Sequence, residues 1–112
     1  MDKQVVINRL TELPGEIEER ENDLLDAKEA LTNAKEALID KQNELLVTGA
    51  IDGKNAEIRF AQMRNLTTQE RAQITKAEIE VGLAQVNANR AINQFKAYRA
   101  VAKIIHGGGI NG

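Results

Sequence analysis

The sequence predicts an all-α fold: an elongated antiparallel helical hairpin, or coiled coil, that starts with a short helix and self-associates into a helical bundle. Three observations predict it. Leucine or isoleucine recurs every seven residues through the first half of the chain, a clear turn signal separates the two halves, and aromatic residues make up only 3% of the chain. Aliphatic side chains of modest size suit a narrow seam between long helices better than a thick core.

The heptad repeat of the first half gives two series of positions. All the a positions are leucine or isoleucine and most d positions are apolar, which is typical of a coiled coil. The basic d residues, Arg20 and Lys41, either fix the register or reach past the seam to an acid. The a positions are Leu10, Ile17, Leu24, Leu31, Leu38 and Leu45, and the d positions are Val6, Leu13, Arg20, Ala27, Ala34 and Lys41.

Pro14 and Gly15 interrupt this helical pattern, although the heptad phase passes through them unchanged. Proline costs about 3 kcal/mol inside a helix but is tolerated in its first turn. Several glutamates follow directly, and anions favour the first turn of a helix. We therefore expect a short helix over 3–13, a break or kink at Pro14, and a helix over 15–47.

Residues 48–55 form the predicted loop. Gly49 suits a helix C-cap, Asp52-Gly53 is a turn signal and Asn55 suits a helix N-cap. A connection of this length usually returns the chain antiparallel. The sequence thus predicts a second helical arm that begins near residue 56.

The second arm is expected to contain a helix over 56–66 and a long helix over 67–105. Thr67 and Glu70 have the spacing of a capping box, which favours a helix start at Thr67. The glycine-rich segment 106–112 is expected to be a flexible tail.

The long helix carries two apolar stripes, and one partner helix cannot cover both. We therefore expect at least a dimer. The first stripe is Ile74, Val81, Ala84, Ala88, Ala91, Phe95, Tyr98, Ala102 and Ile105; the second is Ile79, Leu83, Val86, Ala97, Val101 and Ile104. The residues assigned to the core and oligomer seam are Leu24, Leu31, Leu38, Leu45, Ile74, Val81, Phe95 and Tyr98.

Composition argues against an enzyme. The chain contains no serine and no cysteine, so the usual acyl-transfer nucleophiles are missing, and its single histidine, His106, has no metal-spaced companion. We predict no catalytic residue, no cofactor and no metal. No apolar run is long enough to span a membrane, so a cytoplasmic protein without membrane contact is expected.

The loop and the helix after it contain a first candidate binding site. Four polar residues, Asp52, Lys54, Asn55 and Arg59, would form a compact tip. They serve either as a turn with a helix cap or as a surface that contacts a partner protein.

Charge is distributed unevenly and gives a second candidate. Residues 1–47 contain 12 acidic and 6 basic residues, a net of −6, whereas residues 48–112 contain 5 acidic and 9 basic residues, a net of +4. The oppositely charged arms attract each other, or the basic end binds an acidic partner or phosphates. The candidate basic patch consists of Arg90, Lys96, Arg99 and Lys103.

The string Gly53-Lys54-Asn55-Ala56-Glu57-Ile58-Arg59, preceded by a helix rich in Leu, Glu and Lys, resembles small helical proteins of tailed phages and prophages. This resemblance implies a phage-type accessory protein in the host cytosol. The leading hypothesis is a non-enzymatic protein that binds itself and a partner protein, as an accessory or inhibitor of a host protein. The alternatives are a nucleic-acid-associated accessory in recombination or replication that uses residues 90–103, and a structural coiled-coil scaffold.

Overall fold

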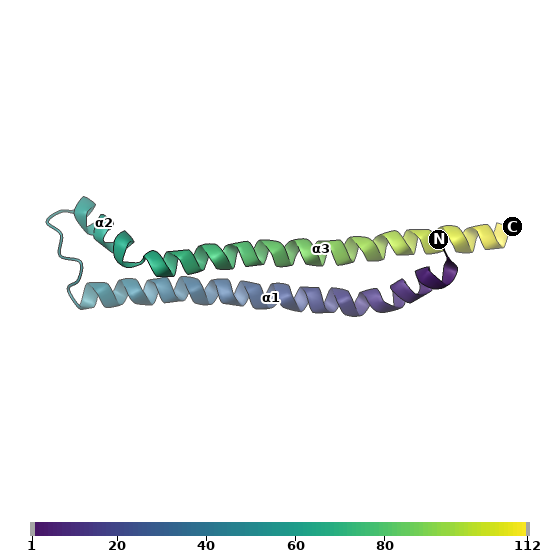
Figure 1. The fold of residues 1–112 in the computed structure, drawn as a ribbon, viewed down its shortest axis with the longest axis horizontal. Coiled ribbons are helices and arrows are strands. Elements are labelled where there is room, and N and C mark those ends of the chain that lie inside the picture. The colour runs from purple at the N-terminus through teal and green to yellow at the C-terminus, as the bar shows by residue number, and fades with distance from the viewer. Residues whose placement is uncertain (1, 112) are drawn as a thin grey trace. The chain divides into compact units, whose positions relative to one another are not determined.

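The computed structural model describes the backbone of residues 2–111 and the side chains of residues 2–107. Within that range the chain forms three α-helices, α1 (Lys3–Val47), α2 (Ala56–Leu66) and α3 (Thr68–Asn111), and no strand (Figure 1). The chain divides into two compact units: unit 1 comprises Met1–Leu25 and Gly82–Gly112, and unit 2 comprises Asp26–Val81.

In unit 1, the first part of α1 lies antiparallel to the last part of α3 (Figure 1). The side chains buried between them are Val6 and Leu13 from α1, and Ala88 and Ala91 from α3. Leucine and valine on one helix and alanine on the other allow close approach of the two backbones. The core of unit 1 is therefore a narrow seam between two helices.

Unit 2 contains the end of α1, the loop, α2 and the start of α3, so the chain reverses its direction within this unit (Figure 1). Its buried side chains are Leu45, Ala77 and Thr67. Both units are thus antiparallel pairs of helices, and the predicted all-α helical hairpin is confirmed.

The heptad positions lie in these seams. Every a and d position of α1 is partly or fully buried, whereas nearly all other residues of that helix are exposed. In α3 the first stripe is also partly or fully buried, together with Ala77, which continues the same spacing. Arg20 and Lys41 form ion pairs with acids three residues further along α1. The distance is 2.8 Å from Arg20 Nη1 to Asp23 Oδ2 and 3.7 Å from Lys41 Nζ to Glu44 Oε2.

Of the break or kink expected at Pro14, the structure shows no break. α1 is continuous from Lys3 to Val47 with Pro14 inside it. Proline removes one backbone donor and clashes with the carbonyl of the fourth residue before it, which is Leu10, and this bends a helix without ending it. The first turns of α1 bend accordingly (Figure 1). Burial of Leu13 next to the proline offsets its cost.

The start of α3 also differs from expectation. The hydroxyl of Thr67 donates to the carbonyl of Met63, with an oxygen–oxygen distance of 2.7 Å, and Thr67 is the C-cap of α2. It therefore does not form the predicted capping box with Glu70, and α3 begins at Thr68. The buried hydroxyl completes the last turn of α2 because an unpaired carbonyl there would be costly.

The far end of α3 is longer than predicted. The helix continues to Asn111, beyond the expected end at Ile105, and Gly112 lies outside the described residues. Extending an existing helix requires no new nucleus, so each glycine costs only about 1 kcal/mol relative to alanine. The flexibility of segment 106–112 stays a prediction.

Candidate binding surfaces

The loop is built by backbone geometry that the sequence signals. Gly49 has a φ of +75°, a left-handed conformation that favours glycine. Its amide donates to the carbonyl of Leu46, and the amide of Ala50 donates to that of Leu45. These two bonds form a Schellman cap, which ends α1. Asn55 caps α2, since its Oδ1 accepts from the amide of Ile58 at 2.9 Å.

Gln62 holds this loop against α2. Its Oε1 accepts from the amide of Gly53 and its Nε2 donates to Asp52 Oδ1, both at 2.8 Å. Gly53 approaches α2 so closely that a Cβ atom there would lie 2.6 Å from Ile58 Cγ2. No sequence motif marks Gln62, because its partners are nine and ten residues earlier in the chain.

Three of the four polar residues predicted at the tip form hydrogen bonds within it, and all four side chains are exposed. Asp52 and Asn55 accept the hydrogen bonds described above, and Arg59 Nη1 donates to the carbonyl of Gly53 at 3.1 Å. The side chain of Lys54 forms no hydrogen bond or ion pair with any of the described residues. Three of the four polar residues thus hold α2 against the loop, each through one side-chain hydrogen bond.

What the tip exposes is the apolar side of α2. None of the 11 residues of α2 is buried. Ala56, Phe60 and Met63 are spaced by four and three residues, so they share one helix face. Phe60 is 66% exposed on this face. We define Ala56, Phe60 and the half-buried Met63 as the α2 face. Ile58 and Gln62 lie on the side of α2 that meets the loop, although Ile58 is still 44% exposed.

The basic candidate lies on α3 within unit 1. Lys96, Arg99 and Lys103 line a surface depression of about 290 Å³ together with Ala100, whereas Arg90 is not part of it. The guanidinium of Arg99 lies 5.8 Å from the centre of the Phe95 ring, which is a cation–π distance. Phe95 and Tyr98 are partly buried, which reduces the ring surface available for stacking on bases.

The ion pairs show whether the acidic residues of the first arm pair directly with the basic residues of the second. Among the described side chains, all five ion pairs lie within α1. Among the described side chains, none of the four candidate basic residues forms an ion pair with an acid. These residues are Arg90, Lys96, Arg99 and Lys103. Direct pairing between the acidic and basic arms therefore does not account for the charge of α3.

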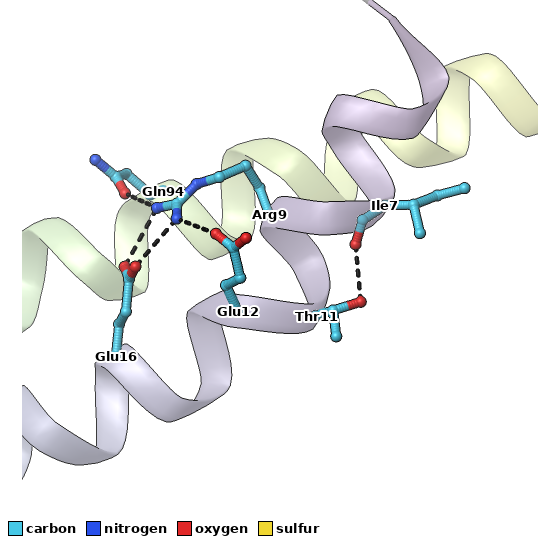
Figure 2. Close-up of polar contacts among 6 residues, drawn as sticks. All are labelled: Ile7, Arg9, Thr11, Glu12, Glu16 and Gln94. Atoms are coloured by element: carbon cyan, nitrogen blue, oxygen red, sulfur yellow. Dashed lines mark hydrogen bonds and ion pairs between the residues drawn. The ribbon is translucent and has the colours of Figure 1, made fainter.

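A polar cluster around Arg9 joins the two helices of unit 1 (Figure 2). The guanidinium of Arg9 binds both carboxylate oxygens of Glu16 at 3.0 and 3.2 Å, Glu12 at 2.9 Å, and Gln94 of α3 at 3.0 Å. Hydrogen bonding to Arg9 lowers the pKa of Glu16, against the smaller effect of its desolvation. The sequence did not predict this cluster because the break or kink expected at Pro14 placed Arg9 and Glu16 in different helices, and Gln94 is in the other arm.

The Arg9 cluster predicts a pH effect. Because the pKa of Glu16 is lower in the folded protein, the pair contributes stability above the ordinary carboxyl pKa and loses it as the pH falls through the folded value. Arg9→Met should raise the pKa of Glu16 toward its ordinary value, measured by NMR titration of the carboxyl carbon. Lys41→Met, a distant control, should leave it unchanged. An unaltered Glu16 titration in Arg9→Met would contradict the assignment.

A cavity of about 90 Å³ lies at the end of unit 1, between Val6, Ile7 and Leu10 of α1 and Ala102 and Ile105 of α3. Pockets for small organic ligands are several times larger, at roughly 300–1,000 Å³. Among the described residues no group of three His, Cys, Asp or Glu side chains could hold a metal ion. None of the described helices combines the length and apolar character needed to cross a membrane.

Comparison with known proteins adds no family. The chain matches no protein-family model, and no curated protein or solved structure is significantly similar to it.

Proposed function

We propose that this chain is a non-enzymatic helical protein that binds a partner protein through the α2 face. The observation that carries the proposal is α2 itself: it has no buried residue and presents Phe60 to solvent. A helix of this length is marginal without packing, but the N-cap, the Thr67 cap and Gln62 hold it in place. A preformed helix loses less conformational entropy on binding.

The spacing of the α2 face indicates the kind of partner. Apolar residues at intervals of four and three are the anchors of helices that bind in hydrophobic grooves of other proteins. We therefore propose a partner with an apolar groove. The resemblance of residues 53–59 to phage proteins supports the role of an accessory or inhibitor that acts on a host protein in the cytosol.

Phe60→Ala tests this function. Removing a central aromatic anchor typically costs about 2–4 kcal/mol of binding, roughly 30- to 1,000-fold in affinity. The fold should be unchanged because this side chain is mostly exposed. Ile39→Ala is a matched control, since Ile39 is 54% exposed in the same unit but lies on α1.

The measurement is capture from a bacterial lysate on immobilised wild-type protein and both variants, with and without nuclease. We expect one stoichiometric protein that is lost with Phe60→Ala, retained with Ile39→Ala and insensitive to nuclease. Recovery that depends on nucleic acid would favour the second function described below. Recovery of nothing except further copies of the chain itself would favour a structural scaffold, and either result would overturn the proposal.

A second candidate function is a nucleic-acid-associated accessory in recombination or replication. It is favoured by the depression lined by Lys96, Arg99 and Lys103 and by the lack of acidic partners for these bases among the described residues. Lysine and arginine on one helix face match the spacing of phosphates only loosely, so any such binding would be independent of base sequence.

A further inference from the structure

α3 has a second face in unit 1 that the hairpin leaves uncovered. It comprises Leu83, Val86, Arg90, Asn93, Ala97 and Ala100, which we define as the outer face. The intervals between these residues are three, four, three, four and three, so they form one stripe along the helix. All six side chains are exposed, including Leu83 at 61%. Neither Arg90 nor Asn93 forms a side-chain hydrogen bond or ion pair among the described residues.

The outer face is complementary to itself when it is reversed. The intervals read the same in both directions, so an antiparallel second copy falls into register without adjustment. In that register Leu83 meets Ala100, Val86 meets Ala97, and Arg90 meets Asn93. Each apolar layer then contains one large and one small side chain, which keeps the two helices evenly spaced.

A parallel pairing of the same face fails on two counts. Leucine and valine would meet themselves at one end and alanine would meet alanine at the other, so the separation of the helices could not be uniform. Arg90 would also face Arg90, and like charges in one layer repel. In the antiparallel pairing Asn93 supplies an oxygen that accepts from the guanidinium of the other copy, so the polar layer fixes the register.

We propose that two copies of this chain pair antiparallel through the outer face of α3, with the two-fold axis passing between Arg90 and Asn93. Such an interface is isologous: each residue pair occurs twice, related by the axis. It covers Leu83, Val86 and Ala97, three members of the second apolar stripe of α3. It uses a surface other than the α2 face, so either proposal can fail while the other stands.

Cysteine pairing tests the register, because the chain has no cysteine of its own. Val86→Cys and Ala97→Cys are prepared separately, with tags of different mass, and oxidised mildly at micromolar concentration. We expect a disulfide-linked dimer that contains one chain of each kind when the two are mixed, and at most a few per cent of dimer from either variant alone. Equal crosslinking of each variant alone, or no mixed dimer, would overturn the proposal.

Sedimentation equilibrium tests the interface without cysteines. The wild type should have twice the mass of one chain, and Leu83→Glu should have the mass of a single chain while keeping its helical circular dichroism. Leu25→Glu is the matched control: Leu25 is 63% exposed in the same unit but on α1, so this variant should remain a dimer. A monomeric wild type, or a Leu83→Glu variant that is still a dimer, would rule out this interface.

Discussion

Leu13→Ala should destabilise the protein by about 2–5 kcal/mol, the usual cost of removing the three outer carbons of a leucine from a packed site and leaving a cavity. Leu13 is 0% exposed, the lowest value among the core side chains. Its neighbour Pro14 has already removed one helical hydrogen bond from this turn, so the seam there depends on side-chain packing. Alanine is as good a helix former as leucine, so the loss measures packing and not propensity.

Urea unfolding followed by circular dichroism measures this loss, at one fixed protein concentration because association would add to the apparent stability. Leu25→Ala is the control, since the same substitution on the same helix removes an exposed side chain and should change stability by no more than about 0.5 kcal/mol. Equal effects of the two substitutions would show that the seam of unit 1 does not hold the fold together.

Replacing Lys96, Arg99 and Lys103 together by glutamine should abolish binding to single-stranded DNA, if the second candidate function holds. Neutralising three phosphates gives a slope of about −2 in a plot of log affinity against log salt, so a tenfold rise in salt weakens wild-type binding by roughly a hundredfold. Glutamine is a comparable helix former, so α3 should remain intact. Fluorescence anisotropy with a labelled oligonucleotide over a range of salt concentrations measures both quantities.

The control variant removes the same number of positive charges from residues outside unit 1. Lys28, Lys35 and Lys54 are exposed and lie outside unit 1, and their joint replacement by glutamine also removes three positive charges. This control should bind DNA with a salt slope close to that of the wild type. Absence of salt-sensitive binding by the wild type, even at low ionic strength, would eliminate the nucleic-acid function.

Periodicity along the chain determines most of the fold. The interval of seven in α1 and the first stripe of α3 identify the residues that the seams bury, because a helix repeats its faces at a fixed spacing. Gly49 and Asn55 mark the ends of helices, since caps depend on residues within a few positions of one another. Features of this kind are local, and a single sequence is enough to predict them.

The tertiary structure decided which partners the polar side chains bond to and which helix faces stay exposed to solvent. Pro14 lies inside α1 without ending it, Thr67 bonds backward to Met63, and Asp52 and Arg59 each form a hydrogen bond within the tip. Thr67, Asp52 and Arg59 could each hydrogen-bond to several groups, and only the folded backbone selects among them. The same holds for Arg9 and Gln94, which are 85 residues apart in the chain and become neighbours only when α3 packs against α1.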